Sequence, residues 1–227
     1  MAEDQDDIGA SGKSVALENR NTGEDGRRYS PSAARNRDAI ADVLAAHMPV
    51  DGHILEIASG TGEHGAAFTD RFESLHWTYS DLDEISLSSQ TAWVDHTDRG
   101  GRLGGPLRLD ASKSHWGEAE SLADLNGIFC ANMIHIAPFE AAEGLIAGAG
   151  RLLPPGGKLF IYGPFARDGA IADSNARFDS DLKRRDESWG VRDLDREVVP
   201  LAQSAGLTLH KVIEMPANNL SVIFQKA

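Results

Sequence analysis

The sequence predicts an α/β domain with a Rossmann-like, seven-stranded, mostly parallel sheet, helices on both faces and a C-terminal antiparallel hairpin. Beyond residue 50, short apolar runs bounded by turn residues alternate with helical stretches, which is typical of βαβ units. Residues 215–219 alone join the last two apolar runs, and so short a link connects antiparallel strands.

The N-terminal part of the chain differs in composition from the rest. Residues 1–28 are rich in Asp, Glu, Gly, Ser and Asn without apolar periodicity, so we expect a disordered acidic tail. The folded domain is expected over residues 29–227. Ser30 and Pro31 predict a helix start, with Ser30 as the N-cap and Pro31 at the first helical position, and Pro49 predicts its end.

The alternating pattern sets the order of the remaining elements. Strands are expected near residues 53–58, 76–80, 106–109, 127–132, 158–163, 207–214 and 220–225. Helices are expected over residues 63–72, 84–96, 139–153 and 194–205, and Gly206 is expected to cap the last. Residues 166–193 form a long insert before the sixth strand. Loops of this length usually carry function or are disordered, and we predict a substrate cap.

Composition and charge exclude several classes of protein. Hydrophobic residues make up 41% and charged residues 25% of the 227, so we expect a packed core that needs no disulfide or metal. Cys130 lies in an apolar run and is expected to be buried. With 22 basic and 35 acidic residues, the formal charge of −13 repels a phosphate backbone and disfavours a nucleic-acid partner. The chain has no apolar run near the roughly 18 residues of a membrane span and no basic, apolar secretory start, so we expect a cytoplasmic protein.

A glycine-rich turn follows the first strand, in the segment LEIASGTGEHG at residues 55–65. Its glycines match the dinucleotide fingerprint, which brings the backbone close to a pyrophosphate at a helix N-terminus. The segment also matches an acid-x-Gly/Ala-x-Gly-x-Gly pattern, with Glu56 as the acid and Ala58 in place of the first glycine. Carboxylates at Glu56 and Glu63 would repel a pyrophosphate but attract the ammonium and sulfonium of S-adenosylmethionine. The acidic turn therefore favours S-adenosylmethionine as the cofactor.

Acidic residues also follow the next two strands. Asp81 ends the second strand, where a carboxylate can accept hydrogen bonds from both ribose hydroxyls of an adenosyl ligand. NAD sites place an acid similarly, and capping a helix is the alternative role for Asp81. Asp110 and Ala111 follow the third strand, a placement that resembles the methyltransferase element contacting the adenine amino group. Together with the terminal hairpin, these residues favour methyl transfer over hydride transfer.

Several segments together carry a family resemblance. They are SPSAARN at 30–36, LEIASGTG at 55–62, SDLD at 80–83, FCANMIHI at 129–136, YGPF at 162–165, RDL at 192–194 and MPANNL at 215–220. These segments resemble the methyltransferase-like family catalogued as domain of unknown function 938, and the resemblance covers nearly everything beyond the tail. It implies a class I fold and S-adenosylmethionine binding. Glu63 and Gly65 depart from the glutamine and alanine that the family leads us to expect.

The expected cofactor site draws on several of these segments. Tyr29 and Arg35 lie at the entrance to the first helix, where folds of this class often close over the cofactor; an exposed, solvated pair of side chains is the alternative. Asn132 follows the fourth strand and is expected to shape the cofactor site. The expected cofactor-binding residues are Tyr29, Arg35, Glu56, Ala58, Gly60, Thr61, Gly62, Asp81, Leu82, Asp110, Ala111 and Asn132.

Candidate catalytic residues follow the fourth and fifth strands, at the carboxyl end of the sheet where open α/β folds bind ligands. His135 is a candidate general base because imidazole titrates near neutrality, although packing or a backbone hydrogen bond is the alternative role. Tyr162 is the second candidate. Much of the catalysis of an in-line methyl transfer can come from alignment, so a base is optional.

Candidate acceptor-binding residues come from the insert and from the last hairpin. We expect Phe178 and Trp189 to form apolar walls and Arg192 to anchor an anionic acceptor. Asn218 and Asn219 are expected to complete the pocket, with a plain Asn-rich turn as the alternative. A structural role is the alternative for Trp189.

The residues thus predict an S-adenosylmethionine-dependent methyltransferase whose acceptor is a small molecule, with an exposed protein side chain as the other acceptor class. A nicotinamide-dependent oxidoreductase is the alternative enzyme. A catalytically silent methyltransferase-like subunit that binds a partner is the third hypothesis, because a fold does not establish a function. The spacing of Cys and His matches no zinc site, and no metal is expected.

Overall fold

The computed structural model describes residues 20–97 and 100–227 of the chain. Its main sheet has seven strands in the order β5-β4-β3-β6-β7-β9-β8. Their bounds are β3 (His53–Ile57), β4 (His76–Asp81), β5 (Leu103–Arg108), β6 (Leu125–Ala131), β7 (Lys158–Pro164), β8 (Leu207–Met215) and β9 (Asn219–Lys226). The first five in this order run parallel, whereas β9 is antiparallel to both β7 and β8. The predicted fold class and its C-terminal hairpin are confirmed.

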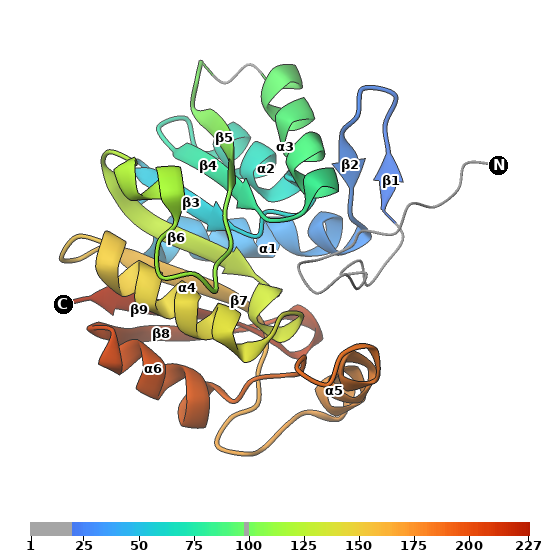
Figure 1. Cartoon of the computed structure of the whole chain (residues 1–227), viewed down its shortest axis with the longest axis vertical. Helices are drawn as coiled ribbons and strands as arrows, with labels where there is room; N and C mark the ends of the chain where they lie inside the picture. Colours follow the sequence, from blue (N-terminus) through green and yellow to red (C-terminus); the bar gives the residue numbers. More distant parts are fainter. Residues whose placement is uncertain (1–19, 98–99) are drawn as a thin grey trace.

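Helices cover both faces of this sheet (Figure 1). They are α1 (Pro31–His47), α2 (Glu63–Arg71), α3 (Glu84–His96), α4 (Phe139–Leu152), α5 (Asp173–Arg185) and α6 (Val199–Ser204). The start of α1 is as predicted, because the Ser30 side chain accepts a hydrogen bond from the Ala33 amide at 3.2 Å and Pro31 opens the helix. No helix within the described ranges is both long and apolar enough to cross a membrane.

The core lies in two apolar layers, one on each face of the sheet. Alternate residues of β6 supply both, because successive side chains of a strand point to opposite faces. Phe129 packs with Phe68 of α2 and Phe160 of β7 in one layer, whereas Ile128 and the buried Cys130 belong to the layer beneath α4 and α6. A strand buried on both faces is consistent with the continuous apolar run in the sequence.

Residues 20–29 differ from the expected tail. They form a small antiparallel hairpin, in which β1 (Asn21–Thr22) pairs with β2 (Arg28–Tyr29). The hairpin lies against α3, where the Tyr29 ring meets Trp93 edge-on at 5.4 Å and the Arg27 guanidinium lies 4.7 Å from the same indole. Strands of two residues have no periodicity that a sequence pattern could reveal. The rest of the expected tail, residues 1–19, lies outside the described residues, so its disorder stays a prediction.

The insert over residues 166–193 contains a helix, α5, that the sequence pattern did not predict. Its apolar side chains amount to little more than Phe178 and Leu182, one pair at helical spacing among charged residues. The helix expected over residues 194–205 begins instead as a π-helical turn, Leu194–Val198, and continues as α6. Strand β5 starts three residues before its predicted start at Pro106, because Gly104 and Gly105 weakened the pattern.

The strand order shows where a ligand site is expected along the sheet. After β3 the chain passes to β4 and β5 on one side, and after β5 it returns to β6 and β7 on the other. The strand order therefore reverses between β3 and β6. Open α/β sheets bind ligands at such a switch point, beyond the carboxyl ends of the strands.

Candidate functional site

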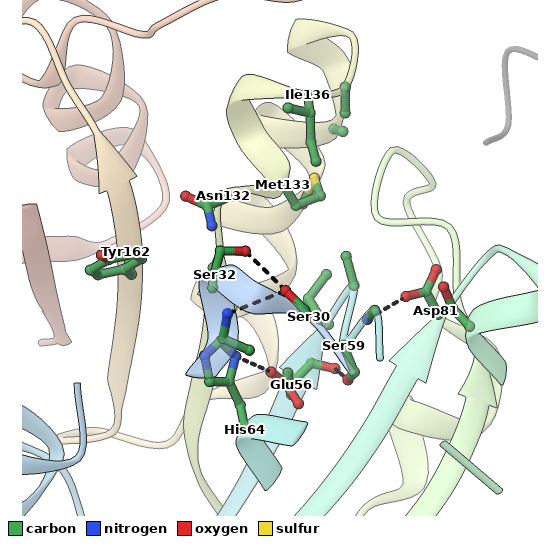
Figure 2. A pocket seen from close by; sticks show the side chains of 18 of the residues that line it. Ser30, Ser32, Glu56, Ser59, His64, Asp81, Asn132, Met133, Ile136 and Tyr162 are labelled. Atoms are coloured by element: carbon green, nitrogen blue, oxygen red, sulfur yellow. Dashed lines mark hydrogen bonds and ion pairs between the residues drawn. The ribbon is translucent and has the colours of Figure 1, made fainter. Parts of the chain in front are cut away.

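A cavity of about 1020 Å³ opens at this switch point. The glycine turn after β3, the ends of β4, β6 and β7 and the start of α1 form one part of its lining, and α5 and the β8–β9 link form another. Figure 2 shows Glu56, Ser59 and Asp81 on one side of the cavity, with Asn132 and Tyr162 on the other. Ligand pockets commonly measure roughly 300–1,000 Å³, so the space is sufficient for a cofactor and a small acceptor together.

The glycine turn depends on three backbone positions. Gly60 and Gly62 have φ angles of 56° and 88°, in the left-handed region that favours glycine. At Gly65 a Cβ would lie 2.4 Å from Tyr79 Cε1 and 2.5 Å from Trp77 Cδ1, so glycine is required for α2 to lie close to β4. The Tyr79 hydroxyl donates a hydrogen bond to the Gly62 carbonyl and fixes the start of α2.

Glu56 brings a buried carboxylate to the cavity wall. It is 1% exposed and lines the cavity. Its Oε2 accepts a hydrogen bond from Trp77 Nε1 at 2.9 Å, and its Oε1 lies 3.7 Å from Nδ1 of His64. A buried carboxylate is costly unless a cation compensates its charge, so this position favours a positively charged group.

Asp81 is fixed by the backbone around it. Its Oδ2 accepts from the Gly60 amide at 2.9 Å, and its Oδ1 accepts from the amides of Leu82 and Asp83 at 2.8 and 3.1 Å. Burial raises the pKa of Asp81 to about 6, against the lowering effect of these hydrogen bonds. Asp83, whose Oδ2 accepts from the Ser86 amide at 2.8 Å, caps α3. Asp81 is therefore not the cap of this helix.

Two residues of α3 donate hydrogen bonds to backbone carbonyls of the glycine turn, and neither was predicted from the sequence. Gln90 Nε2 donates to the Gly60 carbonyl at 3.0 Å and lies 3.4 Å from Asp81 Oδ2. The Ser89 hydroxyl donates to the Thr61 carbonyl at 2.8 Å and accepts from the Arg28 amide at 2.9 Å. With Ser86, these side chains are buried at i, i+3 and i+4 spacing. A polar stripe on the inner face of a helix is the signal that could have identified them.

The other wall carries neutral polar groups from the ends of β6 and β7. Asn132 turns the chain after β6 with a φ of 63°, and its backbone N–H donates to the Tyr162 backbone carbonyl at 2.7 Å. The side chains of Asn36 and Asn219 act on the Tyr162 hydroxyl by lowering its pKa, but burial has the larger effect. Burial raises the pKa of Tyr162, so the phenol is neutral near pH 7.

The insert and the last hairpin meet at the same wall. Asn175 Nδ2 of α5 donates to the Asn218 carbonyl at 2.9 Å, and Asn218 Nδ2 donates to the Ser174 hydroxyl at 2.9 Å. Phe178 and Trp189 of the insert line the cavity. The insert therefore contributes apolar walls and is fixed to the β8–β9 link by amide hydrogen bonds.

Most of the residues proposed from the sequence lie together on this cavity. Those that line it are Arg35, Glu56, Ala58, Gly60, Thr61, Asp81, Leu82, Asp110, Ala111, Asn132, Tyr162, Phe178, Trp189 and Asn219. Those that do not are Tyr29, Gly62, His135, Arg192 and Asn218. Lining residues that the sequence analysis did not propose include Arg20, Ser32, Asn36, His64, Met133, Ile136 and Glu140.

His135 does not occupy the position expected of a general base. It is 0% exposed, its ring meets Phe165 edge-on at 4.9 Å, and its Nδ1 accepts from the Arg192 amide at 3.3 Å. Burial lowers the pKa of His135 to about 3, so the imidazole is neutral. The alternative role of a packed histidine, bonded to backbone, describes this geometry.

Arg192 binds backbone carbonyls of the protein itself, whereas the sequence led us to expect it to bind an anionic acceptor. Its guanidinium donates to the carbonyls of Ile134, Ala137 and Ser188 at 2.9, 2.9 and 2.8 Å. It lies 5.2 Å from the Phe139 ring. These contacts fix the insert to the segment that follows β6, so Arg192 supports the cavity from outside its lining.

Comparison with known sequences gives one family. Residues 27–226 match the family described as a protein of unknown function, DUF938. The match spans all the strands of the main sheet and the helices α1 to α6.

Comparison with solved structures gives methyltransferases. An O-methyltransferase family protein from Burkholderia thailandensis superposes with a TM-score of 0.70 at 17% identity, over 86% of this chain and 57% of that one. CalO1, a methyltransferase in calicheamicin biosynthesis solved with S-adenosylhomocysteine, gives 0.67 at 18% identity, over 86% and 54%. An O-methyltransferase family 2 protein from Planctomyces limnophilus, in complex with apigenin, gives 0.68 at 18% identity, over 86% and 60%. The chain spans little more than half the length of these proteins, and the likeness is one of fold.

Proposed function

The chain belongs to the DUF938 family, and from this premise we propose that it is an S-adenosylmethionine-dependent methyltransferase acting on a small molecule. One observation carries the proposal: two acidic side chains, Glu56 and Asp81, face one cavity beside a glycine turn. The cofactor carries an ammonium and a sulfonium, which carboxylates attract, and ribose hydroxyls, which they bind as acceptors. The methyltransferase fold of the structural neighbours supports the same assignment.

The lining residues fit the parts of this cofactor. Asp81 accepts from three backbone amides and, at a longer 3.4 Å, from Gln90 Nε2. A carboxylate has about four lone-pair directions, so a ribose hydroxyl would take the place of this long Gln90 contact. Glu56 would hold the ammonium, and Asp110 with Ala111 would contact the adenine amino group; all three residues line the cavity. Arg20 and Arg35 line the same cavity and would offset the negative charge of the cofactor's own carboxylate group.

The chain contributes mainly orientation and exclusion of water to the proposed reaction. When bound, the cofactor would supply a methyl group on a sulfonium. A lone pair of the acceptor would form the new bond to the methyl carbon while the carbon–sulfur bond breaks, its electron pair staying on sulfur, and any proton on the acceptor atom would pass to solvent. Met133, Ile136 and Phe178 surround the space with apolar groups, which favours alignment of the acceptor lone pair with the methyl carbon. Tyr162, as a neutral phenol, holds a polar atom of the acceptor by a hydrogen bond and takes up no proton.

A small acceptor fits the form of the cavity better than a protein side chain. The insert brings α5 and Trp189 over the cavity, so the acceptor site is walled on the side away from the sheet. Phe178 and Trp189 favour a partly apolar, planar molecule, because aromatic rings offer such groups a large contact area. On this proposal the insert over residues 166–193 is the substrate cap.

A nicotinamide cofactor is disfavoured by the charge of the lining. The residues that line the cavity include five acidic ones, Glu56, Asp81, Asp83, Asp110 and Glu140. A pyrophosphate with two negative charges would meet repulsion there. The same carboxylates suit a ligand with two cationic groups.

Two measurements test the proposal. Titration calorimetry of the full chain should show binding of S-adenosylhomocysteine and no binding of NAD, and the reverse result would overturn it. Incubation with S-adenosylmethionine and a deproteinised metabolite extract should produce S-adenosylhomocysteine. Cofactor binding without turnover in extracts of any source would instead support the silent, partner-binding alternative.

A further inference from the structure

The residues that line the cavity divide by charge along the sequence. Among the described lining residues, Glu140 is the last charged one, and every later one is uncharged. Those from residue 162 onward come from the end of β7, the insert and the last hairpin, and we call them the cap wall. The cap wall comprises Tyr162, Pro164, Ser174, Asn175, Phe178, Trp189, Pro216, Ala217 and Asn219. It offers hydroxyl, amide and aromatic groups but no ion.

The insert that supplies part of the cap wall is itself rich in charge. Nearly half of residues 166–193 are Asp, Glu, Lys or Arg, yet the insert residues that line the cavity are Ser174, Asn175, Phe178 and Trp189. The charged side chains of the insert therefore lie off the cavity. The fold separates an uncharged side of the insert, which faces the acceptor space, from a charged side that does not.

Cations of the insert are engaged by other groups of the protein. Lys183 contacts Asp179 of the same helix at 2.7 Å, and Arg167 contacts Asp195 at 2.7 Å. The Arg192 guanidinium donates to three backbone carbonyls. None of these three cations lines the cavity.

A negatively charged acceptor would be poorly held by the cap wall. Asn175 is 5% and Trp189 2% exposed, so a group bound against them would lose much of its water. A buried ion without a partner of opposite charge costs more free energy than hydrogen bonds to neutral amides and hydroxyls contribute. The two arginines of the lining, Arg20 and Arg35, come from the N-terminal hairpin region and α1, and on the proposed function they offset the cofactor's carboxylate.

A positively charged acceptor is disfavoured by the cofactor itself. The sulfonium is a permanent cation, and it would repel a second cation brought close enough for methyl transfer. A protonated amine also lacks the lone pair that the new bond needs. Glu140 is the lining carboxylate closest in sequence to the cap wall, but it is exposed in the first turn of α4, and its charge already favours the charged form of Arg192.

The cap wall instead suits neutral hydrogen-bonding groups. Nδ2 of Asn219 donates to the Pro216 carbonyl at 3.1 Å, and an amide has a second N–H and an oxygen that can serve a ligand. The Tyr162 hydroxyl can donate or accept. Such groups match a hydroxyl, carbonyl or ether of the acceptor, and Phe178 with Trp189 match its apolar part.

We propose that the acceptor is an uncharged molecule and that the cap wall selects it by excluding ions. This inference rests on the proposed function and deepens it. In the transfer, a lone pair of the neutral acceptor atom forms the bond to the methyl carbon, the electron pair of the carbon–sulfur bond stays on sulfur, and a proton of the acceptor passes to solvent. Molecules that carry a carboxylate, a phosphate or a protonated amine should be poor acceptors.

The first test uses the full, unaltered chain with S-adenosylmethionine and a deproteinised metabolite extract. The extract is separated at about pH 7, where carboxylates and amines are ionised, on an anion-exchange and a cation-exchange resin. Uncharged molecules pass through both resins. S-adenosylhomocysteine should form with this uncharged fraction. Formation with an eluted anionic or cationic fraction at an equal or higher rate would overturn the inference.

Paired substitutions at Phe178 test the effect of charge on the cap wall. Methionine and lysine have unbranched side chains of similar length, so Phe178→Lys differs from Phe178→Met mainly in its cation. With the uncharged fraction, Phe178→Lys should form S-adenosylhomocysteine at least about tenfold more slowly than Phe178→Met, because the ammonium would have no partner in the cap wall. Ser180→Lys is the matched control, since it adds the same charge to an exposed position of α5 outside the lining and should leave the rate unchanged.

The same pair of variants would reveal an anionic acceptor, because a lysine in the cap wall would assist its binding. A rate for Phe178→Lys equal to or above that of Phe178→Met would therefore contradict the inference. Thermal unfolding and S-adenosylhomocysteine affinity of each variant should stay close to those of the unaltered chain, which checks the fold and the cofactor site. The fractionation does not depend on the folding of any variant.

The outcomes separate the two proposals. Turnover with an ionic fraction would overturn this inference and leave the proposed function standing. Absence of S-adenosylhomocysteine binding, or of turnover with the unfractionated extract, would overturn the proposed function and this inference with it.

Discussion

The Gly60 amide donates to Asp81 Oδ2 at 2.9 Å, so the turn after β3 and the acid at the end of β4 form one hydrogen-bonded unit. Gln90 reinforces this unit from α3, where its side-chain amide reaches the Gly60 carbonyl. The backbone of the turn and the carboxylate are therefore positioned before any ligand arrives. Preorganisation of this kind lowers the entropic cost of binding.

Replacement of Asp81 should affect binding more than folding. Hydrogen bonds to a charged acceptor contribute roughly 1.5–3 kcal/mol each, so Asp81→Ala should weaken S-adenosylhomocysteine binding by about one to two orders of magnitude. Calorimetry and thermal unfolding on the same variant check this. Unchanged affinity with lowered stability would remove Asp81 from the cofactor site.

The pH dependence of binding should report the same carboxylate. Burial raises the pKa of Asp81 to about 6 in the free protein, and the ribose hydroxyls need the ionised form as an acceptor. The affinity of 5′-methylthioadenosine, which cannot engage Glu56 through an ammonium, should fall as the pH drops through about 6, by at most about tenfold per pH unit.

The protonation of Asp81 affects folding stability in the opposite direction to ligand affinity. A carboxyl group whose pKa is raised by folding stabilises the free protein most below its unfolded pKa, and this contribution is lost as the pH rises through about 6.

In Asp81→Ala the fall of affinity below about pH 6 should disappear. A pH profile identical to that of the unaltered chain would assign the titration to another group.

Gln90 should act on affinity through the glycine turn. Gln90→Leu removes the donor to the Gly60 carbonyl and to Asp81, and the loss of one or two hydrogen bonds should weaken S-adenosylhomocysteine binding by roughly fivefold to tenfold. Thr91→Ala is the matched control, because its exposed hydroxyl bonds the Leu87 carbonyl of the same helix. Equal effects of the two substitutions on affinity would show that α3 responds as a whole and that Gln90 has no particular role.

Many of the residues that line the proposed cofactor half of the cavity could be predicted from the sequence, because their positions depend on local pattern. Strand β3 is a continuous apolar run, and Glu56, Gly60 and Asp81 follow from where strands end. Ser89 and Gln90 were not predicted, because a buried polar residue within a helix can be recognised as functional only when the neighbour of the helix is known. Their partners are carbonyls about 30 residues away in the chain.

The acceptor half depends on tertiary contacts, and there the sequence was a weaker guide. His135 follows a strand like the other site residues, but the short helical turn Met133–His135 directs it under the insert instead of into the cavity. Arg192 offers the same lesson, because a cation in a long loop can bind a ligand or satisfy backbone carbonyls equally well. Three carbonyls converge on its guanidinium, and no sequence pattern indicates them.

Arg192 should matter for stability rather than for the cofactor. Arg192→Ala leaves the carbonyls of Ile134, Ala137 and Ser188 without their donor, which should lower the free energy of unfolding by roughly 2–4 kcal/mol. Arg196→Ala is the control, since that side chain contacts the exposed Asp168 at the surface of the same region. Chemical denaturation measures both. A loss of affinity for S-adenosylhomocysteine without loss of stability would contradict the structural role.

Removal of residues 1–26 should have a small effect on folding. The cut takes away β1 and the residues before it, but it leaves Tyr29 on Trp93 and the cap of α1 at Ser30. We expect the thermal midpoint to fall by no more than about 4 °C, equivalent to about 1 kcal/mol in a domain of this size. Affinity for S-adenosylhomocysteine should also decrease by a few fold, because Arg20 lines the cavity. A larger thermal shift would show that residues 1–26 stabilise the domain through more than the pairing of β1 with β2.

Gly65 offers a prediction in which this chain departs from its family resemblance. An alanine there would place its Cβ 2.4 Å from Tyr79 Cε1 and 2.5 Å from Trp77 Cδ1, and both rings are fully buried. Overpacking of this kind costs roughly 1–3 kcal/mol, so Gly65→Ala should lower the free energy of unfolding by that amount. The loss arises from steric overlap, and Gly65 itself has no positive φ.

A smaller side chain at position 79 of β4 should therefore restore part of the stability that Gly65→Ala loses. Tyr79→Leu alone should be destabilising, because it removes a buried ring and the hydrogen bond to the Gly62 carbonyl. In Gly65→Ala combined with Tyr79→Leu, the total loss measured by chemical denaturation should be at least about 1 kcal/mol smaller than the sum of the single losses. Strict additivity would mean that α2 shifts away from β4 to admit the methyl group, and that the close helix–strand approach is not what requires glycine at this position.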